Sequence, residues 1–339
     1  DHGSLVFGAL WGERRWTPAE RLSVQAGARV EIGEPVVNGG PLRIGPRLAA
    51  RYRLTPDLAL SAGYGRAFQY VQTIGAIGTE AFGPVFALGH LRLLAGDEVP
   101  ALRSDIATLG AEWWLGGGWL ASANSYLRSS TGVAVPDPSP GAIVDRPLFA
   151  EGVTTARGVE FGARRIAGRW TLSAGYALSA AETEAAGLRF ASDQDRRHTL
   201  DVTTMARLSD SWRLGAAYSA ASGSPYTRFF EGWQSCDEAG RCTWAMPPRL
   251  EAPNAERLPA YASLDLLADW SHRFRRWEMG AYLQLRNVLN RENPGAYLKS
   301  YGYDCASGCS NEFEGDRYLI DDFGPRLPIL PLFGFRASF

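Results

Sequence analysis

The chain consists of successive segments in which apolar residues alternate with small or polar ones. In residues 22–30 the even positions read Leu, Val, Ala, Ala and Val, whereas the odd positions read Ser, Gln, Gly and Arg. The same split recurs in residues 58–65, 170–178, 212–218 and 264–270. Because successive side chains of a β-strand point to opposite faces, this period of two predicts strands with one apolar and one polar face.

The length of these segments separates a membrane protein from a soluble sandwich. The runs extend over about 12 to 15 residues, whereas strands of soluble proteins usually have about 5 or 6. A strand tilted in a bilayer needs about 10 residues to cross the hydrocarbon layer. No run of about 18 apolar residues occurs that could form a transmembrane helix. We therefore predict an all-β fold, a transmembrane antiparallel β-barrel, with residues 1–339 forming one domain.

The connections between the predicted strands alternate between tight turns and long segments. The tight turns are predicted near residues 17–18, 55–57, 116–118, 168, 209–210 and 275. The long segments are residues 33–41, 71–102, 130–153, 183–193, 225–256 and 291–326. Short periplasmic turns and long extracellular loops are typical of bacterial outer-membrane barrels. This pattern predicts an outer-membrane location with the long loops outside and the C-terminus in the periplasm.

Tryptophan residues recur beside the predicted tight turns. Indole rings favour the lipid headgroup level, where an apolar body and an N–H donor are both accommodated. We therefore predict a periplasmic membrane girdle made of Trp16, Trp119, Trp170, Trp212 and Trp277.

Counting the segments predicts about 13 strands, the last from about Leu327 to Phe339. Bacterial single-chain barrels have an even number of strands. The first predicted strand also runs toward a tight turn, which places Asp1 at the extracellular rim. An open sheet edge facing lipid would leave unpaired backbone groups at a cost of several kcal/mol each. We therefore expect that further N-terminal strands, and a plug, exist outside this chain.

Composition and charge exclude some classes of function. The formal net charge is −1 and 21% of the residues are charged, so no basic excess indicates a nucleic-acid partner. The four histidines, His2, His90, His198 and His272, are far apart and have no carboxylate at triad or metal-ligand spacing. We predict neither an enzyme nor a metal or cofactor site.

Charges of both signs lie on the predicted polar faces. In a passive porin such charges would set ion selectivity, whereas in a plugged barrel they would pair with one another and hold the plug. The mixture of signs along the strands favours the second interpretation. The arginines are Arg29, Arg47, Arg51, Arg213 and Arg286, and the acids are Glu31, Glu112, Glu160, Asp201, Asp265 and Glu278.

Two of the long segments contain close cysteine pairs and many aromatic residues. Cys236 with Cys242, and Cys305 with Cys309, lie in polar loops and lack C-x-x-C spacing, which favours disulfides over a four-thiolate metal site. Rigid rings on a constrained loop can bind a small ligand at little ordering cost, although they can also form an extracellular girdle. The predicted ligand-binding residues are Tyr226, Phe229, Phe230, Trp233, Trp244, Tyr297, Tyr301 and Tyr303.

The second of these segments also carries several acids. Carboxylates can hold calcium through their oxygen atoms, although acidic loops are usually only solvated. These acids are Glu312, Glu314, Asp316, Asp321 and Asp322.

The C-terminal residues alternate strictly and end on an aromatic side chain. Phe333, Phe335 and Phe339 share one face of the predicted last strand. Such an ending resembles the signal read by the barrel assembly machinery, which would then be a partner, although an ordinary last strand could have the same sequence.

Four segments resemble successive barrel strands of TonB-dependent receptors. They are PRLAARYRLTPDLALSAGYGRAFQ (Pro46–Gln69), ARGVEFGARR (Ala156–Arg165), DRRHTLDVTTMARLSDSWRLGAAYSAASGSPYT (Asp195–Thr227) and LQLRNVLNRENP (Leu283–Pro294). The resemblance implies a barrel of 22 strands around a plug, of which this chain would be the C-terminal part.

The resemblance also implies a function. The expected activity is import of a scarce nutrient, such as a siderophore, cobalamin, glycan or peptide, energised by a TonB-type complex acting through the plug. The sequence itself contains neither a recognisable plug nor a TonB box. A passive porin or channel, and a non-transporting surface anchor or adhesin, are the alternatives.

Overall fold

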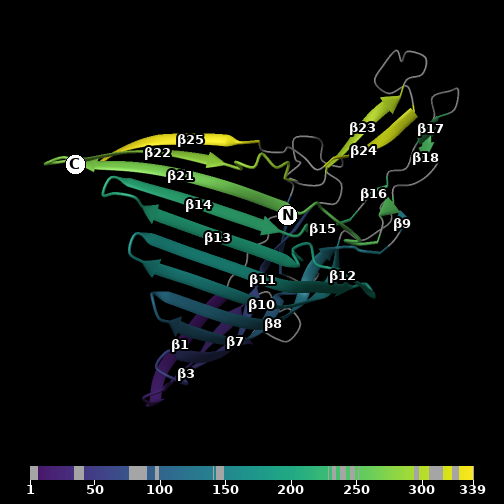
Figure 1. Cartoon of the computed structure of the whole chain (residues 1–339). Helices are drawn as coiled ribbons and strands as arrows, with labels where there is room; N and C mark the ends of the chain where they lie inside the picture. The colour runs from purple at the N-terminus through teal and green to yellow at the C-terminus, as the bar shows by residue number, and fades with distance from the viewer. Residues whose placement is uncertain are drawn as a thin grey trace. The chain divides into compact units, whose positions relative to one another are not determined.

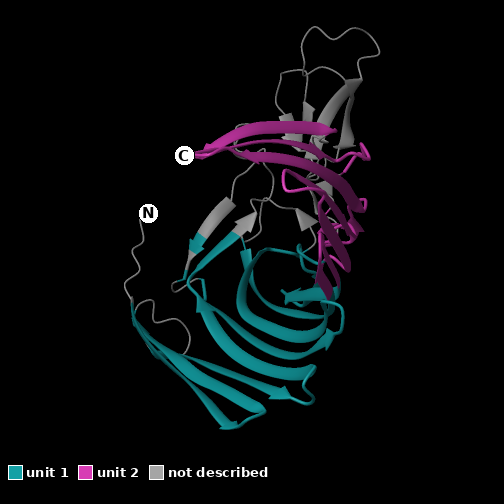
Figure 2. Cartoon of the chain, turned by 60° about the vertical axis from the view of Figure 1, so that its left-hand side comes forward, with its two compact units in different colours: residues 1–140, 145–162, 177–195 teal, residues 141–144, 163–176, 196–339 magenta. Residues whose placement is uncertain are grey.

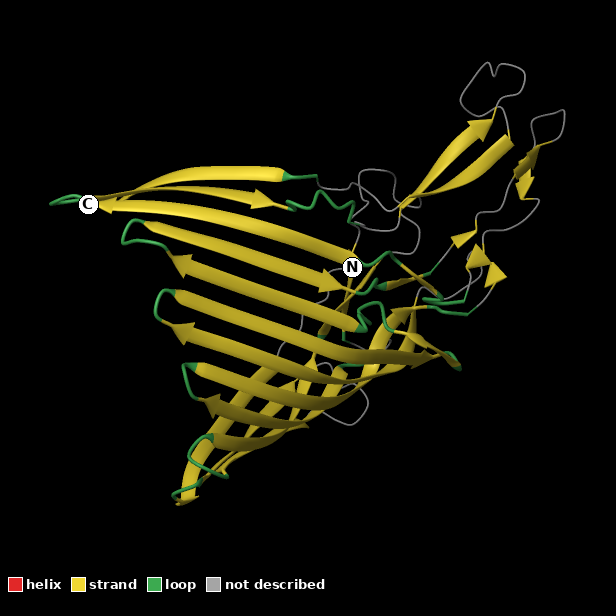
Figure 3. Cartoon of the chain, in the orientation of Figure 1, coloured by secondary structure: helices red, strands yellow, loops and turns green. Residues whose placement is uncertain are grey.

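The computed structural model describes most of the chain. The described residues are 7–33, 42–75, 90–95, 99–139, 141–142, 149–227, 229–230, 234–236, 242–244, 249–250, 252–293, 298–304, 316–322 and 328–338. Only the backbone is described for residues 7, 74–75, 90–92, 94, 141–142, 229–230, 234–236, 242–244, 249–250, 298–304 and 316–322. The regular elements of the described residues are all strands (Figures 1 and 3). The described residues contain no helix that is long and apolar enough to cross a membrane.

The main sheet has 14 strands among the described residues. Thirteen of them are hydrogen-bonded in chain order, and β12 (Leu188–Ala191) pairs with β11. The thirteen are β1 (Phe7–Ala19), β2 (Leu22–Gly33), β3 (Leu42–Arg53), β4 (Leu58–Gln69), β7 (Leu102–Leu115), β8 (Trp119–Pro136), β10 (Phe149–Ala167), β11 (Trp170–Ala185), β13 (His198–Arg207), β14 (Trp212–Ala221), β21 (Tyr261–Arg273), β22 (Glu278–Arg286) and β25 (Leu330–Ser338). The predicted all-β antiparallel fold is confirmed.

Short strands pair with one another inside segments that were predicted as long connections. The pairs are β5 (Val71–Gly75) with β6 (His90–Leu94), β15 (Pro225–Tyr226) with β20 (Glu256–Arg257), β17 (Gln234–Cys236) with β18 (Cys242–Trp244), and β23 (Leu298–Asp304) with β24 (Asp316–Asp322). A three-stranded group joins β16 (Phe229–Phe230), β19 (Arg249–Leu250) and β9 (Gly141–Ala142).

Contacts divide the chain into two compact units, which are described separately (Figure 2). Unit 1 contains residues 1–140, 145–162 and 177–195, and unit 2 contains residues 141–144, 163–176 and 196–339. That residues 1–339 form a single domain stays a prediction.

The strand register in unit 1 separates an apolar from a polar face. One cross-strand row on the apolar face consists of Ala26, Leu48, Tyr64, Ala107 and Leu127. A row on the polar face consists of Ser23, Arg51, Ser61, Gly110 and Asn124. The register thus groups side chains of like polarity across strands that are distant in sequence.

Unit 2 shows the same division. Trp212, Trp270, Ala281 and Phe335 form one row on its apolar face. Arg213, Asp269, Tyr282 and Gly334 form a row on its polar face. The side chain of Tyr282 lies over Gly334, where an added Cβ would approach the ring to 2.5 Å. An aromatic side chain covering a glycine in this way stabilises a sheet that has no side chain at that position.

Two predicted connections differ from the structure. The first turn forms at Glu20 and Arg21, because β1 continues through Thr17 and Pro18 with a register irregularity between Trp16 and Ala19. A bulge tolerates proline, which has no N–H to donate to the ladder.

The second difference concerns residues 183–193, which were predicted as a loop. In the structure β11 and β12 pair there as a hairpin whose turn residues, Ala186 and Gly187, both have positive φ, 50° and 74°. Such a turn matches the right-handed twist of the flanking strands.

Candidate functional site

A hollow of about 300 Å³ lies in unit 1, near the ends of β2, β3 and β4 that lead to long connections. We call it the arginine hollow. Its lining residues are Arg29, Glu31, Gly45, Arg47 and residues 66–70. Glycine is needed at position 45, because a Cβ there would approach the carbonyl oxygen of Arg66 to 2.7 Å.

A buried carboxylate organises one side of this hollow. Glu31 is buried; Arg29 donates from Nε to its Oε1 over 2.5 Å, and the hydroxyl of Tyr70 donates to its Oε2. The guanidinium of Arg43 lies over the Tyr70 ring, 5.2 Å from its centroid. Burial, followed by the hydrogen bond to Glu31, raises the pKa of Tyr70 to about 12. The phenol therefore remains protonated and continues to donate at neutral pH.

Arg47 provides further positive charge in the lining of the hollow. Its side chain is exposed, and it has no ion-pair partner among the described residues. The lining of the hollow therefore contains two arginines with an acidic partner, Arg29 and Arg66, and one without, Arg47. Guanidinium groups bind carboxylate and similar anionic groups through paired N–H donors, so the hollow suits an anionic ligand.

Gln72 connects β5, the strand that follows Tyr70, to neighbouring segments through its side chain. Its side-chain amide is buried and donates to the carbonyl oxygens of Pro100 (3.1 Å) and Gly132 (2.7 Å). Its Oε1 accepts a hydrogen bond from the N–H of Ala134 over 2.9 Å. These three bonds satisfy a buried amide and tie β5 to β8, which holds the chain on one side of the hollow.

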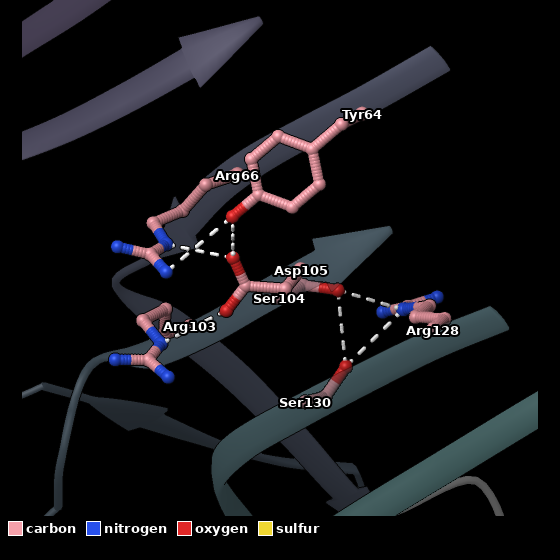
Figure 4. A network of polar contacts seen from close by, with 7 residues as sticks. All are labelled: Tyr64, Arg66, Arg103, Ser104, Asp105, Arg128 and Ser130. Carbon is pink, nitrogen blue, oxygen red and sulfur yellow. Dashed lines mark hydrogen bonds and ion pairs between the residues drawn. The ribbon is translucent and has the colours of Figure 1, made fainter. Parts of the chain in front are cut away.

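A further polar network crosses β4, β7 and β8 of unit 1 and has members on both faces (Figure 4). On the polar face, Arg128 donates from Nε to the hydroxyls of Ser104 (2.8 Å) and Ser130 (3.2 Å). On the apolar register, three side chains gather around Asp105 instead. They are Tyr64, Arg66 and Arg103.

Unit 2 contains a second charged cluster on its polar face. Arg336 forms two hydrogen bonds with the Asp269 carboxylate, at 2.6 and 3.0 Å, and Arg213 approaches it to 2.7 Å. The Asp269 side chain is only 10% exposed, whereas those of Arg213 and Arg336 are 47% and 44% exposed. A buried carboxylate thus joins β14, β21 and the C-terminal strand.

The predicted pairing of polar-face charges is confirmed for several residues. The ion pairs are Arg29–Glu31, Arg51–Glu112 at 2.7 Å and Arg286–Asp265 at 3.4 Å. Asp269 and Arg336 were missed, although both lie at polar positions of the register and that alternation could have identified them.

The structure places the predicted girdle and assembly residues without testing their roles. Trp119, Trp170 and Trp212 begin β8, β11 and β14, Trp277 directly precedes β22, and Trp16 lies three residues before the end of β1. Phe333 and Phe335 are 75% and 80% exposed on the apolar face of β25, and Phe339 lies outside the described residues.

The predicted ligand-binding aromatics are distributed over short strands. Tyr226 lies in β15, and only backbone positions are described for Phe229 and Phe230 in β16, Trp244 in β18, and Tyr301 and Tyr303 in β23. Trp233 and Tyr297 lie outside the described residues, as do Glu312 and Glu314 of the acidic segment. Ligand contact and calcium binding therefore stay predictions.

One predicted disulfide agrees with the backbone register. Cys236 and Cys242 are Cα partners in the antiparallel pair β17–β18, and directly opposed residues have Cα atoms about 4.5 or 5.5 Å apart, within the range of disulfides. Cys305 and Cys309 lie outside the described residues.

We expect mass spectrometry of the alkylated, unreduced protein to find no free thiol and to find the peptides containing Cys236 and Cys242 linked. Alkylation of both residues without prior reduction would contradict the prediction.

Comparison with known proteins assigns the chain to a family. The family model "TonB dependent receptor-like, beta-barrel" matches residues 4–288. The chain belongs to the TonB-dependent receptor family. This membership, together with the antiparallel sheet, confirms the predicted outer-membrane β-barrel fold. A search among curated proteins found no match.

Solved structures of TonB-dependent receptors resemble the chain in fold. The ferripyoverdine receptor of Pseudomonas aeruginosa is 14% identical, with a TM-score of 0.52, 85% of this chain covered and 35% of that chain. The ferric yersiniabactin uptake receptor of Yersinia pestis is 14% identical, with a TM-score of 0.56 and coverage of 98% and 46%. The ferric enterobactin receptor of P. aeruginosa, as a mutant, is 14% identical, with a TM-score of 0.57 and coverage of 98% and 44%. The chain spans less than half the length of these receptors.

Proposed function

We propose that this chain forms part of the barrel of a TonB-dependent importer of a scarce nutrient. The family match over residues 4–288 carries the proposal. The partners would be the outer-membrane lipid, the barrel assembly machinery and a TonB-type energising complex acting through a plug. The long connections would be extracellular and the C-terminus periplasmic, as short turns on the periplasmic side require.

We propose further that the nutrient is an anionic chelate of the ferric siderophore type. The names of the similar receptors mention ferripyoverdine, ferric yersiniabactin and ferric enterobactin. The arginine hollow supports this class, because Arg47 is uncompensated and Arg29 retains exposed N–H groups at 39% side-chain exposure. Cobalamin, glycans and peptides are the alternatives.

Uptake by whole cells tests both parts of the proposal. Cells that produce the full-length protein should accumulate a labelled ferric siderophore under iron limitation, and a protonophore should abolish accumulation. Uptake that survives the protonophore would identify a passive porin. Binding at the cell surface without any uptake would identify an anchor or adhesin.

The double variant Arg29→Gln with Arg47→Gln tests the hollow. We expect the affinity for an anionic chelate to fall about 30-fold, because two charge-assisted contacts are lost and each contributes about 1 kcal/mol at a partly exposed site. Arg189→Gln is the matched control, since Arg189 belongs to an exposed pair with Glu184 at 3.4 Å in the same unit. Unchanged affinity in the double variant would exclude the hollow as the binding site.

A further inference from the structure

A second hollow, of about 500 Å³, opens on the apolar face of unit 1. It lies over β3, β4, β7 and β8, where three alanines alternate with larger side chains. The small residues are Ala50, Ala62 and Ala107, and the larger apolar ones are Leu48, Leu109 and Leu127, with Tyr64 at the edge. Its volume lies within the range of small-molecule sites. In an outer-membrane barrel the apolar face is the one that meets lipid, so this acyl-groove, as we call it, opens toward the bilayer.

A charged cluster follows the acyl-groove on the same register. The side chain of Asp105 accepts hydrogen bonds from the Tyr64 hydroxyl (2.6 Å) and from Nε of Arg66 (2.7 Å). Arg103 approaches its second carboxylate oxygen to 3.1 Å. In the strand register, Asp105 lies opposite Arg66. On this face, the pair Arg66–Asp105 is the next one after the groove-lining pair Tyr64–Ala107, in the direction of the long connections. Two arginines around one aspartate leave the cluster positively charged.

The charge of this cluster and the polar residues beside it indicate the level at which it lies in the membrane. A charged side chain on the lipid-facing register is costly at the bilayer midplane and nearly free of cost at the interface. On β8 the same register changes at this level from Leu127 to the polar residues Ser129 and Thr131. The arginine cluster therefore lies at the headgroup level of the leaflet on the long-connection side.

The cluster retains donors for a ligand from that leaflet. Within the described part of the chain, Arg103 uses its Nε toward Asp105, and Arg66 uses its Nε and makes one longer contact of 3.4 Å from Nη2 to Tyr64. Their side chains are 46% and 31% exposed. Each guanidinium carries five N–H donors, so both can also bind a phosphate, which arginine recognises through paired donors.

We propose that the acyl-groove and the arginine cluster together bind a phosphorylated, acylated glycolipid of the outer leaflet, namely lipopolysaccharide. One acyl chain would lie in the groove between Leu48, Leu109 and Leu127, and a phosphate of the glycolipid would bind Arg66 and Arg103. The choice of leaflet rests on the proposed function, which places the long connections outside the cell.

Binding of diphosphorylated lipid A to the purified full-length protein in detergent tests this site. Native mass spectrometry or a fluorescence titration gives the affinity. The variant Arg66→Gln with Arg103→Gln should bind at least 10-fold more weakly than the unchanged protein. Ala107→Leu, which fills the groove and leaves every charge in place, should also weaken binding, and both variants should keep the heat-modifiable gel shift of a folded barrel.

Arg128→Gln is the matched control, because Arg128 lies at nearly the same level on the polar face (Figure 4). The affinity of this variant for lipid A should stay within twofold of that of the unchanged protein. Equal binding by the original protein and by Arg66→Gln with Arg103→Gln would overturn the proposal, and so would an equal loss in Arg128→Gln. Equal affinity for phosphatidylglycerol would overturn the assignment to lipopolysaccharide.

An epitope inserted in a turn tests the leaflet independently of the lipid titration. Insertion after Gly187, in the β11–β12 turn, should be detected by antibody on intact cells, whereas insertion after Gly117, in the β7–β8 turn, should be detected only after permeabilisation. The reverse result would overturn the proposed orientation and the outer-leaflet ligand, even if lipid A bound in detergent. Normal orientation without lipid A binding would overturn the lipid site alone and leave the importer unaffected.

Discussion

Replacing Asp269 by alanine is expected to lower the free energy of unfolding by about 2–3 kcal/mol. The carboxylate of Asp269 is nearly buried and accepts hydrogen bonds from Arg213 and Arg336. Hydrogen bonds to charged groups contribute about 1.5–3 kcal/mol. Removal of one member of a fully buried pair costs about 3–5 kcal/mol. Solvent reaches both arginines, which are almost half exposed, so the expected loss falls below that upper range.

The unfolding of Asp269→Ala can be followed by urea titration in detergent, with tryptophan fluorescence and the heat-modifiable gel shift as readouts. Asp201→Ala is the control, because Asp201 is exposed on the polar register and accepts a single hydrogen bond from Ser219 over 2.6 Å. Its loss should be about 1 kcal/mol or less, as for a single hydrogen bond with one partner. If the two variants lost equal stability, the cluster would contribute nothing beyond an ordinary surface contact.

The strands could be predicted from the sequence because their physical cause is local. Each strand has to present apolar side chains to one surface and polar ones to the other, so alternation identifies it even without knowledge of its neighbours. The count of about 13 strands and the order of short and long connections followed from that pattern. The barrel of 22 strands and the plug came from the resemblance to a family, and no alternation in this chain indicates them.

The errors arose where backbone conformation is decided by pairing between strands. Ala186 adopts positive φ in the β11–β12 turn, a conformation that alanine rarely adopts and that its identity does not predict. Likewise, proline at position 18 suggested a turn, whereas a register irregularity accommodates it within β1. Both outcomes depend on a partner strand, which a local pattern does not contain.

The sequence predicts on which face of the sheet a charged residue lies, but it does not predict which residues form ion pairs. Alternation placed Arg213 on the polar face. Its contact with Asp269, which also binds Arg336, 123 residues further on, depends on the register of four strands. Arg66 and Asp105 are polar residues at apolar positions of the alternation, and they were not identified for that reason. Such exceptions to a pattern mark where the environment of the face changes, here at the proposed lipid headgroup level.

Replacing Gly223 by alanine should loosen the base of the long connection between β14 and β21 without unfolding the sheet. A Cβ at this position would lie 1.6 Å from the carbonyl oxygen of Leu258, so the backbone has to move. The N–H of Leu258 donates to the carbonyl oxygen of Ser224 over 3.0 Å, and Arg257 donates to that of Gly223 over 3.1 Å. These bonds flank the β15–β20 pair, which closes the segment that carries the predicted ligand-binding aromatics.

Overpacking of this kind costs about 1–3 kcal/mol, and each 1.4 kcal/mol changes an opening equilibrium about tenfold when cleavage follows the open population. We therefore expect trypsin to cleave residues 228–251 at least about 5-fold faster in Gly223→Ala, while the urea midpoint of the barrel stays unchanged. Gly175→Ala serves as the control, because no atom lies within 4 Å of a Cβ added there. If this connection binds the nutrient, the affinity of Gly223→Ala should fall with its rising protease sensitivity. Faster cleavage at unchanged affinity would instead place the binding site elsewhere, with the arginine hollow as the remaining candidate.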